Sequence, residues 1–231
     1  MDQKLFSNPF RRRPTGAKAR PTIPIKELRE RDRRRVLRHF LELENSDRLL
    51  RFGSMLSDEL VTNYVNKIDF SRDMVYGVYN HVFRLVAIGH LAFAPKEASP
   101  VKGATSKDRV AELGVSVLGQ ARGMGIGSRL FERAIIHCRN NDIDTLYMHC
   151  LSSNRAMMHI AKKAGMEIHR DYGEADAYLK LPPPDPASML HEAVQEQFAT
   201  LDYTFKANVR AAVKWLDRLP GRGGKGKASR K

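Results

Sequence analysis

The sequence predicts a mixed α/β fold, in which a mixed β-sheet carries helices on both faces and a long C-terminal helix follows it. Apolar residues alternate from Ala111 to Val117, which predicts a strand with one buried face. Directly afterwards, apolar residues recur four positions apart from Ile126 to Cys138, which predicts a helix. Segments of both types alternate over residues 22–181 in the order βααβββαβαββ, as expected for a sheet covered by helices.

The elements before the central strand are expected in the first 93 residues. We expect strands at Thr22–Leu28, Met74–Tyr79 and Phe83–Phe93, and helices at Arg29–Leu43 and from the N-cap residue Ser57 to about Ile68. The segment Asn45–Gly53 is interpreted as a loop. Residues 94–108 contain prolines and a glycine, and are expected to form a loop that leads into the central strand.

The elements after the central strand follow the same pattern. We expect a helix at 126–139, a strand at Asp144–Leu151, a helix from about Asn154 to Lys163 that Gly165 closes, and strands at Met166–Arg170 and Ala175–Leu181. Pro182–Pro184 then form a stiff spacer, and Asp185 and Pro186 are suited to begin a long helix that ends near Leu216. Its apolar stripe needs a covering surface, which is either the rest of the domain or a second copy of the chain in a homodimer.

The net charge of +14 is distributed unevenly, and with the sequence pattern it divides the chain into four parts. Residues 1–20 and 218–231 hold eleven of the fourteen net positive charges, and both are expected to be disordered basic segments. Between them lie the α/β domain, residues 21–181, and the spacer with its amphipathic helix, residues 182–217. Cationic arms can bind nucleic acid, but they are equally typical of solvated tails, and the C-terminal arm lacks aromatic residues for base stacking. A nucleic-acid partner is therefore possible but not favoured.

The cysteines and the hydropathy exclude several classes of protein. The two cysteines, Cys138 and Cys150, form neither a metal-binding spacing nor a disulfide framework, so a reducing cytoplasm and no metal are expected. No apolar run approaches the roughly 18 residues that span a bilayer, so no membrane association is expected.

A glycine-rich turn, Arg122-Gly123-Met124-Gly125-Ile126-Gly127, joins the central strand to the following helix. Unpaired amides and the helix dipole make such a junction an anion site, and glycines let a phosphate approach the backbone. A P-loop would end in Gly-Lys-Ser/Thr, and a dinucleotide fingerprint would have the spacing G-x-G-x-x-G; neither matches. An ordinary strand–helix turn and an acyl-CoA pyrophosphate loop remain.

The spacing Arg122-x-x-Gly125-x-Gly127 resembles the pyrophosphate loop of the Gcn5-related N-acetyltransferase (GNAT) superfamily. A second stretch, from Ser152 through Asn154-Arg155-Ala156 to Lys163-Ala164-Gly165-Met166, is similar to that family's Asn-x-Ala…Lys-x-Gly-Phe segment. The resemblance covers about residues 22–181 and implies a mostly antiparallel sheet. Leu50-Arg51-Phe52, the helix start at Leu56–Glu59 and the stretch Ile68–Asp73 also resemble the acetyltransferase domain of bacterial protein-lysine acetyltransferases.

This resemblance implies that acetyl-CoA is the cofactor. The amides of the turn would hold the pyrophosphate, the backbone of the central strand would pair with pantetheine, and the side chain of Asn154 would bond to the pantetheine arm. The residues concerned are Val115, Ser116, Val117, Arg122, Gly123, Met124, Gly125, Ile126, Gly127, Ser128 and Asn154.

The chemistry of acetyl transfer needs a base for the amine and a donor to the thioester oxygen. Glu112, on the strand face opposite the apolar stripe, is the candidate catalytic base, and a backbone N–H near Ser116 or Val117 is the candidate oxyanion donor. Many relatives place a tyrosine acid where this chain has Ala161; Ser153, His159 and Tyr172 are weak substitutes. Arg51, Phe52 and His90 are candidates for contacting the acceptor, although a core role for His90 is equally consistent with its position.

We therefore expect an acyltransferase that moves an acetyl group from acetyl-CoA to a primary amine, of a small molecule or a protein lysine. The alternative is a regulatory module that binds acetyl-CoA without turnover and docks to nucleic acid or a protein through its basic arms.

Overall fold

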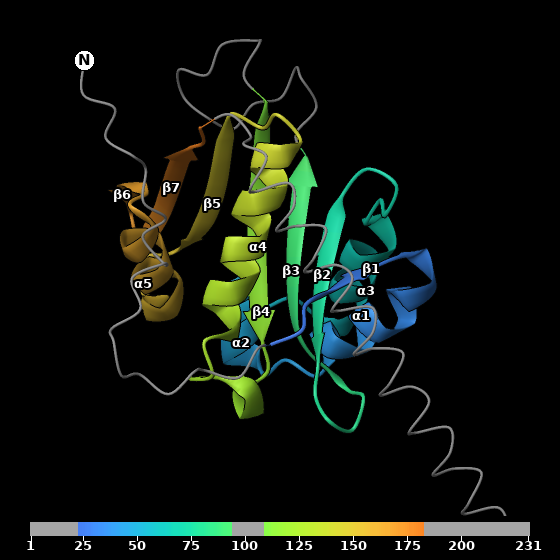
Figure 1. Cartoon of the computed structure of the whole chain (residues 1–231). Helices are drawn as coiled ribbons and strands as arrows, with labels where there is room; N and C mark the ends of the chain where they lie inside the picture. The colour runs from blue at the N-terminus through green and yellow to red at the C-terminus, as the bar shows by residue number, and fades with distance from the viewer. Residues whose placement is uncertain (1–22, 94–108, 183–231) are drawn as a thin grey trace, which may run out of the picture.

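The structure is a computed structural model that describes residues 23–93 and 109–182. These residues form a seven-stranded sheet with the order β1-β2-β3-β4-β5-β7-β6 (Figure 1). Every neighbouring pair is antiparallel except β4 and β5, which are parallel. The strands are β1 (Lys26–Leu28), β2 (Met74–Tyr79), β3 (Leu85–Phe93), β4 (Val110–Val117), β5 (Thr145–Leu151), β6 (Glu167–Asp171) and β7 (Glu174–Lys180).

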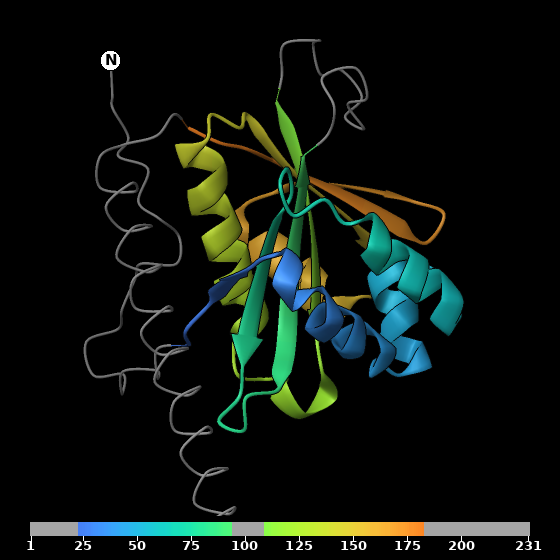
Figure 2. The ribbon, with the colours of Figure 1, turned by 90° about the vertical axis from the view of Figure 1, so that its right-hand side faces the viewer.

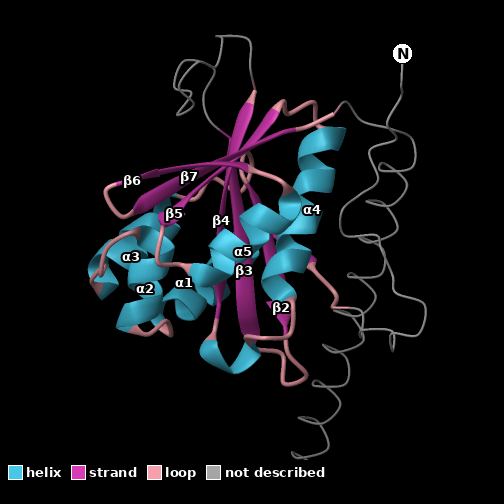
Figure 3. Cartoon of the chain, turned by 90° about the vertical axis from the view of Figure 1, so that its left-hand side faces the viewer, coloured by secondary structure: helices cyan, strands magenta, loops and turns pink. Residues whose placement is uncertain are grey.

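Helices cover both faces of this sheet (Figures 2 and 3). One face carries α1 (Arg33–Leu41), α2 (Asn45–Phe52) and α3 (Asp58–Lys67), and the other carries α4 (Ile126–Asn140) and α5 (Arg155–Ala164). The expected mixed, mostly antiparallel sheet between helices is therefore confirmed. The long helix expected at 186–217, both basic arms and the 94–108 loop lie outside the described residues. No described helix has the length and apolar character needed to cross a membrane.

The interpretation of Asn45–Gly53 as a loop is wrong, because these residues form α2. Gly53 closes the helix in a left-handed conformation with φ of 74°, as is usual for a glycine after the last helical turn. The buried face of α2 is polar, since Asp47 and Arg48 are its buried residues. The Arg48 guanidinium satisfies the carbonyls of Leu41, Leu43 and Leu56 at 3.0, 3.3 and 3.0 Å. The apolar Phe52 of α2 is only partly buried against the core, so the fully buried positions of this helix are not the apolar ones.

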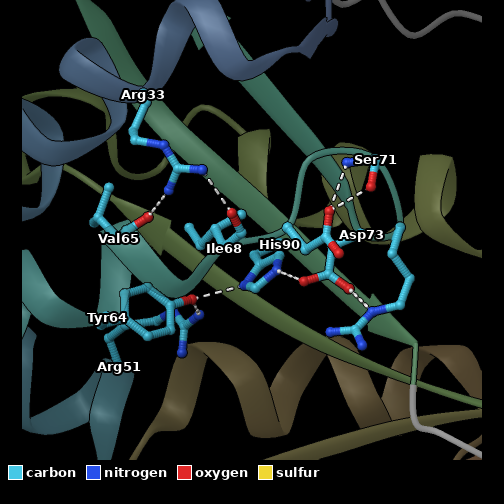
Figure 4. Close-up of polar contacts among 10 residues, drawn as sticks. Arg33, Arg51, Tyr64, Val65, Ile68, Ser71, Asp73 and His90 are labelled. Carbon is cyan, nitrogen blue, oxygen red and sulfur yellow. Dashed lines mark hydrogen bonds and ion pairs between the residues drawn. The ribbon is translucent and has the colours of Figure 1, made fainter.

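The expected first strand is shorter than predicted, since β1 begins at Lys26 and not at Thr22, but caps and boundaries elsewhere follow the sequence closely. The Ser57 side chain accepts a hydrogen bond from the Leu60 amide and begins α3, and Gly165 ends α5 with φ of 72°. The expected first helix is divided, because a 3₁₀ segment at Glu30–Asp32 precedes α1. The guanidinium of Arg33 donates to the carbonyls of Val65 and Ile68, which fixes the end of α3 against α1 (Figure 4).

The central strand β4 is paired unequally on its two sides. On one side it pairs with β3 along nearly its whole length, from Ala111 to Val117. On the other side it pairs with β5 only at Val110, Ala111 and Glu112. Beyond Glu112 the two strands diverge, and Figure 1 shows them adjacent at one end and apart at the other. The divergence leaves one edge of β4 without a strand partner.

A buried histidine joins α1 to this strand. His39 Nδ1 lies 3.2 Å from the Leu85 carbonyl oxygen, and Nε2 lies 2.7 Å from Ser116 Oγ on β4. Because a carbonyl only accepts, Nδ1 carries the proton and Nε2 accepts from the serine hydroxyl, so the ring is neutral. Burial lowers the pKa of His39 to about 4 and outweighs the hydrogen bond with Leu85, which acts in the opposite direction.

This pKa predicts acid-sensitive folding. The unfolded chain takes up a proton on His39 near pH 6.5 and the folded chain only near 4, so the contribution to stability is complete above pH 6.5 and is lost as the pH falls towards 4. We expect the unfolding free energy, measured by chemical denaturation, to fall over this range with a smaller slope in His39→Gln. His159→Gln, at an exposed position of α5, is the control and should retain the wild-type slope. Equal slopes in wild type and His39→Gln would contradict the assignment.

Candidate active site

The glycine-rich turn forms the N-terminus of α4 and presents unpaired amides. Gly123 and Gly125 have φ of 74° and 77°, and Gly125 is the N-cap residue. A Cβ on either glycine would meet no other atom within 4 Å, so both glycines face open space. Among the described residues, no group accepts a hydrogen bond from the amides of residues 123–128. These free N–H groups lie at the positive end of a 15-residue helix, and the arrangement favours a bound anion.

The candidate residues of the turn divide into amides that are available and groups that are already used. The Arg122 amide donates to the Gly119 carbonyl at 3.2 Å, so it is the one amide of the predicted set that the turn itself occupies. The Arg122 side chain pairs with Asp47 of α2 and donates to the Val117 carbonyl. Ile126 is buried and anchors the turn, whereas the Met124 side chain is exposed. A Cβ on Gly127 would lie 3.2 Å from Ile160, which brings α4 and α5 close together.

The open edge of β4 lies beside this turn. The Leu118 amide donates to the Val86 carbonyl, so the alternation of an antiparallel ladder directs the even-numbered amides of β4, including that of Ser116, towards β3. The N–H and C=O groups of Val115 and Val117 consequently point towards the side from which β5 has diverged. They are the backbone groups with which an extended ligand can pair, and they restrict the candidate oxyanion donor to Val117 or Val115 rather than Ser116.

Asn154 lies on the opposite side of the divergence, between β5 and α5. Its Oδ1 caps α5 by accepting from the Met157 amide at 3.2 Å, and its Nδ2 donates to the Leu50 carbonyl of α2 at 3.2 Å. The side chain is nearly buried. Asn154 therefore ties three elements together, and one hydrogen of its Nδ2 is left for a ligand.

Glu112 projects from β4 on the face that carries α1–α3. It is exposed, and it lies opposite Ala92 of β3 and Tyr147 of β5 in the sheet register. It is the last residue of β4 that is paired with β5, so its carboxylate lies where the strands begin to diverge. Its charge adds to the effect of burial in raising the pKa of both Tyr64 and Tyr147.

A chain of polar side chains crosses the same face (Figure 4). Arg51 Nη2 lies 2.8 Å from Tyr64 Oη, which lies 2.7 Å from His90 Nδ1; His90 Nε2 lies 3.1 Å from Asp73 Oδ2. Burial opposes ionisation of Asp73, but the hydrogen bonds from His90 and Arg72 outweigh it and keep the pKa of Asp73 below its usual value. Burial raises the pKa of Tyr64. His90 is thus a buried histidine with both ring nitrogens hydrogen-bonded, and it forms the middle of this chain.

The residues named as substitutes for a missing acid do not converge. Ala161 is fully buried in α5 and belongs to the core beneath β5. Tyr172 is fully exposed in the β6–β7 turn. Ser153, just before α5, and His159, within α5, are also exposed. The described residues include no cluster of three or more metal-ligating side chains, and both cysteines are buried and form no disulfide.

Sequence reasoning missed Tyr64, Asp73, Asp47 and His39 as parts of this region. Tyr64 lies within the predicted helix from Ser57 to about Ile68, and Asp73 is the last residue of the stretch Ile68–Asp73, but neither is indicated as part of a site. The polar chain draws its members from α2, α3, the segment before β2, and β3. Because these elements meet only in three dimensions, no spacing along the chain indicates the contact.

A sequence profile described as the acetyltransferase (GNAT) family matches residues 37–166, which is more than half of the chain. The match begins in α1 and ends after α5, so it includes the turn, the open edge of β4, Asn154 and the polar chain.

Solved structures with similar folds carry related descriptions. The GNAT domain of PAT from S. lividans has 18% identity and a TM-score of 0.55, with 68% of this chain and 89% of that chain covered. An N-acetyltransferase from Staphylococcus aureus Mu50 has 15% identity and a TM-score of 0.51, covering 70% and 100%. Spermidine N-acetyltransferase from Vibrio cholerae, in complex with CoA and spermine, has 17% identity and a TM-score of 0.51, covering 68% and 94%. At these identities the likeness concerns the fold alone.

Proposed function

Because the chain belongs to the GNAT acetyltransferase family, we propose that it moves an acetyl group from acetyl-CoA directly to a primary amine, of a small molecule or of a protein lysine. The family makes it an acyltransferase with acetyl-CoA as donor and an amine as acceptor. The observation that carries the proposal is the set of free amides at residues 123–128 beside the open edge of β4.

The residues of this region fit a nucleotide thioester. The amides of residues 123–128 and the dipole of α4 suit the pyrophosphate, and the backbone of Val115 and Val117 suits the amide groups of the pantetheine arm. The remaining Nδ2 hydrogen of Asn154 faces the same arm from the other strand. The Arg122 side chain, being paired with Asp47, shapes the turn rather than binding phosphate directly. When bound, acetyl-CoA supplies an activated acetyl group as a thioester.

The protein side of the reaction is proton removal and charge stabilisation. We assign Glu112 as the general base, because it is exposed on the face of β4 that carries α1–α3 and lies next to the point where β4 and β5 diverge. The candidate donor to the oxygen that gains negative charge is the amide of Val115 or Val117, whichever of the two does not pair with the pantetheine arm. Ala161 supplies no acid, so the thiolate of the product leaves without protonation by that residue.

The regulatory alternative is favoured by one observation, the apolar Ala161 at the position where relatives carry a tyrosine. The two functions differ in turnover. Steep salt-dependent binding of RNA or DNA without release of CoA thiol over a panel of amines would support the regulatory module. Thiol release that depends on the amine supports the enzyme.

A substitution at Gly125 tests the cofactor site. Gly125→Trp places a bulky side chain over the free amides, and we expect the affinity for CoA in calorimetry to fall by at least about tenfold, as for the loss of a charged hydrogen bond. Gly165→Trp is the matched control. Gly165 has the same left-handed conformation, and a Cβ there would also meet no atom within 4 Å, but this glycine ends α5 instead of beginning α4. It should bind CoA as the wild type does. Equal affinity of both variants and wild type would remove the site.

A substitution at Glu112 tests the general base. Glu112→Gln keeps the shape of the side chain but cannot accept the proton of the amine, so we expect kcat to fall by about 10²–10⁴-fold and the pH–rate profile to change. Glu59→Gln, in the exposed first turn of α3, is the control and should behave as wild type. A Glu112→Gln enzyme with an unchanged rate and pH profile would exclude Glu112 from the mechanism.

A further inference from the structure

The guanidinium of Arg51 is held in an aromatic enclosure. Its Cζ lies 5.0 Å from the ring centroid of Phe52, 5.6 Å from that of Tyr64 and 5.9 Å from that of Phe40. It also lies against Gly114 of β4, where a Cβ would lie 2.5 Å from Cζ and 2.8 Å from Nη1. Gly114 is needed here because any side chain would displace the cation.

Among the described residues, this cation has no carboxylate partner. Its single hydrogen bond runs from Nη2 to the Tyr64 hydroxyl, and its Nε is buried without a partner. Other partly buried arginines of the same helix layer differ: Arg48 pairs with Asp58, and Arg33 pairs with Glu30. A partly desolvated guanidinium without a counter-charge is costly, and it is stabilised when an anion binds.

The polar chain behind Arg51 orients it but does not neutralise it. Arg51 can only donate to Tyr64, so the Tyr64 hydroxyl proton is directed to His90 Nδ1 and His90 Nε2–H to Asp73. The carboxylate of Asp73 is therefore separated from the guanidinium by two side chains and is already engaged by His90 and Arg72. The chain fixes the direction of the guanidinium and leaves its charge for another group.

The place of this charge relative to Glu112 indicates the ligand. Gly114 follows Glu112 by two residues on the same face of β4, which corresponds to about 7 Å along a strand. Two hydrogen bonds of about 3 Å that are inclined to the strand leave space only for a molecule whose amine and carboxylate lie close together, as they do in an α-amino acid. Arg51 is only partly exposed, so the carboxylate would be partly desolvated and strongly bound.

We propose that the acceptor is a small amino acid-type molecule, whose carboxylate binds Arg51 while its amine faces Glu112. This inference rests on the proposed acetyl transfer and narrows its acceptor from amines in general to amines that carry a carboxylate. Tyr64, His90 and Asp73 act as positioning residues, because they reach the acceptor only through Arg51.

The test compares matched acceptors. CoA thiol release is measured for wild type with L-amino acids, their carboxamides and the corresponding decarboxylated amines. We expect kcat/KM to be at least about tenfold higher for a carboxylate-bearing acceptor, and Arg51→Met, which keeps the packing against the three rings, to abolish this preference by lowering kcat/KM for the amino acid about 10–100-fold. The amine and the carboxamide should change by less than about threefold. Arg84→Met, at an exposed ion pair with Glu42, should match wild type.

Two further variants separate recognition from structure. Arg51→Lys keeps the charge without the fork of donors and should give an intermediate preference. Tyr64→Phe keeps the ring but releases the guanidinium, so the KM for the amino acid should rise while kcat changes less. A uniform loss of kcat/KM for all three acceptor types in Arg51→Met, or equal use of the three by wild type, would overturn the inference.

Failure of the proposed function gives a different result. If no amine releases thiol, the acetyl transfer itself is contradicted, and calorimetry on the complex with CoA then decides the inference. Binding of the amino acid but not its carboxamide to wild type, and its absence in Arg51→Met, would support a carboxylate site at Arg51. Equal binding of both compounds would overturn it.

Discussion

The structure depends on one constraint: the backbone N–H and C=O groups of a central strand need partners. On the side of β3, β4 satisfies this requirement along nearly its whole length, but on the side of β5 it does so for three residues only. In most sheets the unpaired edge of an interior strand would be costly. Here the Val115 and Val117 amides, which have no strand partner, lie next to the free amides that begin α4, so two sets of unsatisfied donors share one region. A ligand with phosphate at one end and amide groups along its length satisfies both.

The diverging strands are held in place by α2, the helix that the apolar pattern did not reveal. Its Asp47 pairs with Arg122 of the glycine-rich turn, and its Leu50 carbonyl accepts from Asn154 at the start of α5. Its Arg51 lies against Gly114 of β4. These three contacts join α2 to the glycine-rich turn, to the start of α5 and to β4. A helix with a largely polar buried face is thus suited to its position, because it bridges groups that an apolar core would leave unpaired.

The sequence predicts what is repeated along the chain and misses what is assembled across it. Alternation in 111–117, four-residue spacing in 126–138, the Ser57 cap and the glycine at 165 each have a local physical cause, and each element is found within one or two residues of its expected place. The polar chain from Arg51 to Asp73 has no such signature, since its four members come from different elements and meet only in the folded structure. Asn154 illustrates the difference: its position as a cap could be predicted, but its bond to Leu50 could not.

The period of two in β4 gives each of its sides a different task. Ala111, Leu113 and Val115 face the core beneath α4 and α5, whereas Glu112, Gly114 and Ser116 face α1–α3. The backbone edge between these faces is left for the cofactor. A slip of one residue between β3 and β4 would exchange the two faces, burying Glu112 beneath α4 and separating Gly114 from Arg51. The hydrogen bond between Ser116 and His39, deep on the α1 side, opposes such a slip because the exchanged register would leave both groups buried and unpaired. The structural pair at one end of the strand therefore protects the placement of the chemical groups at the other.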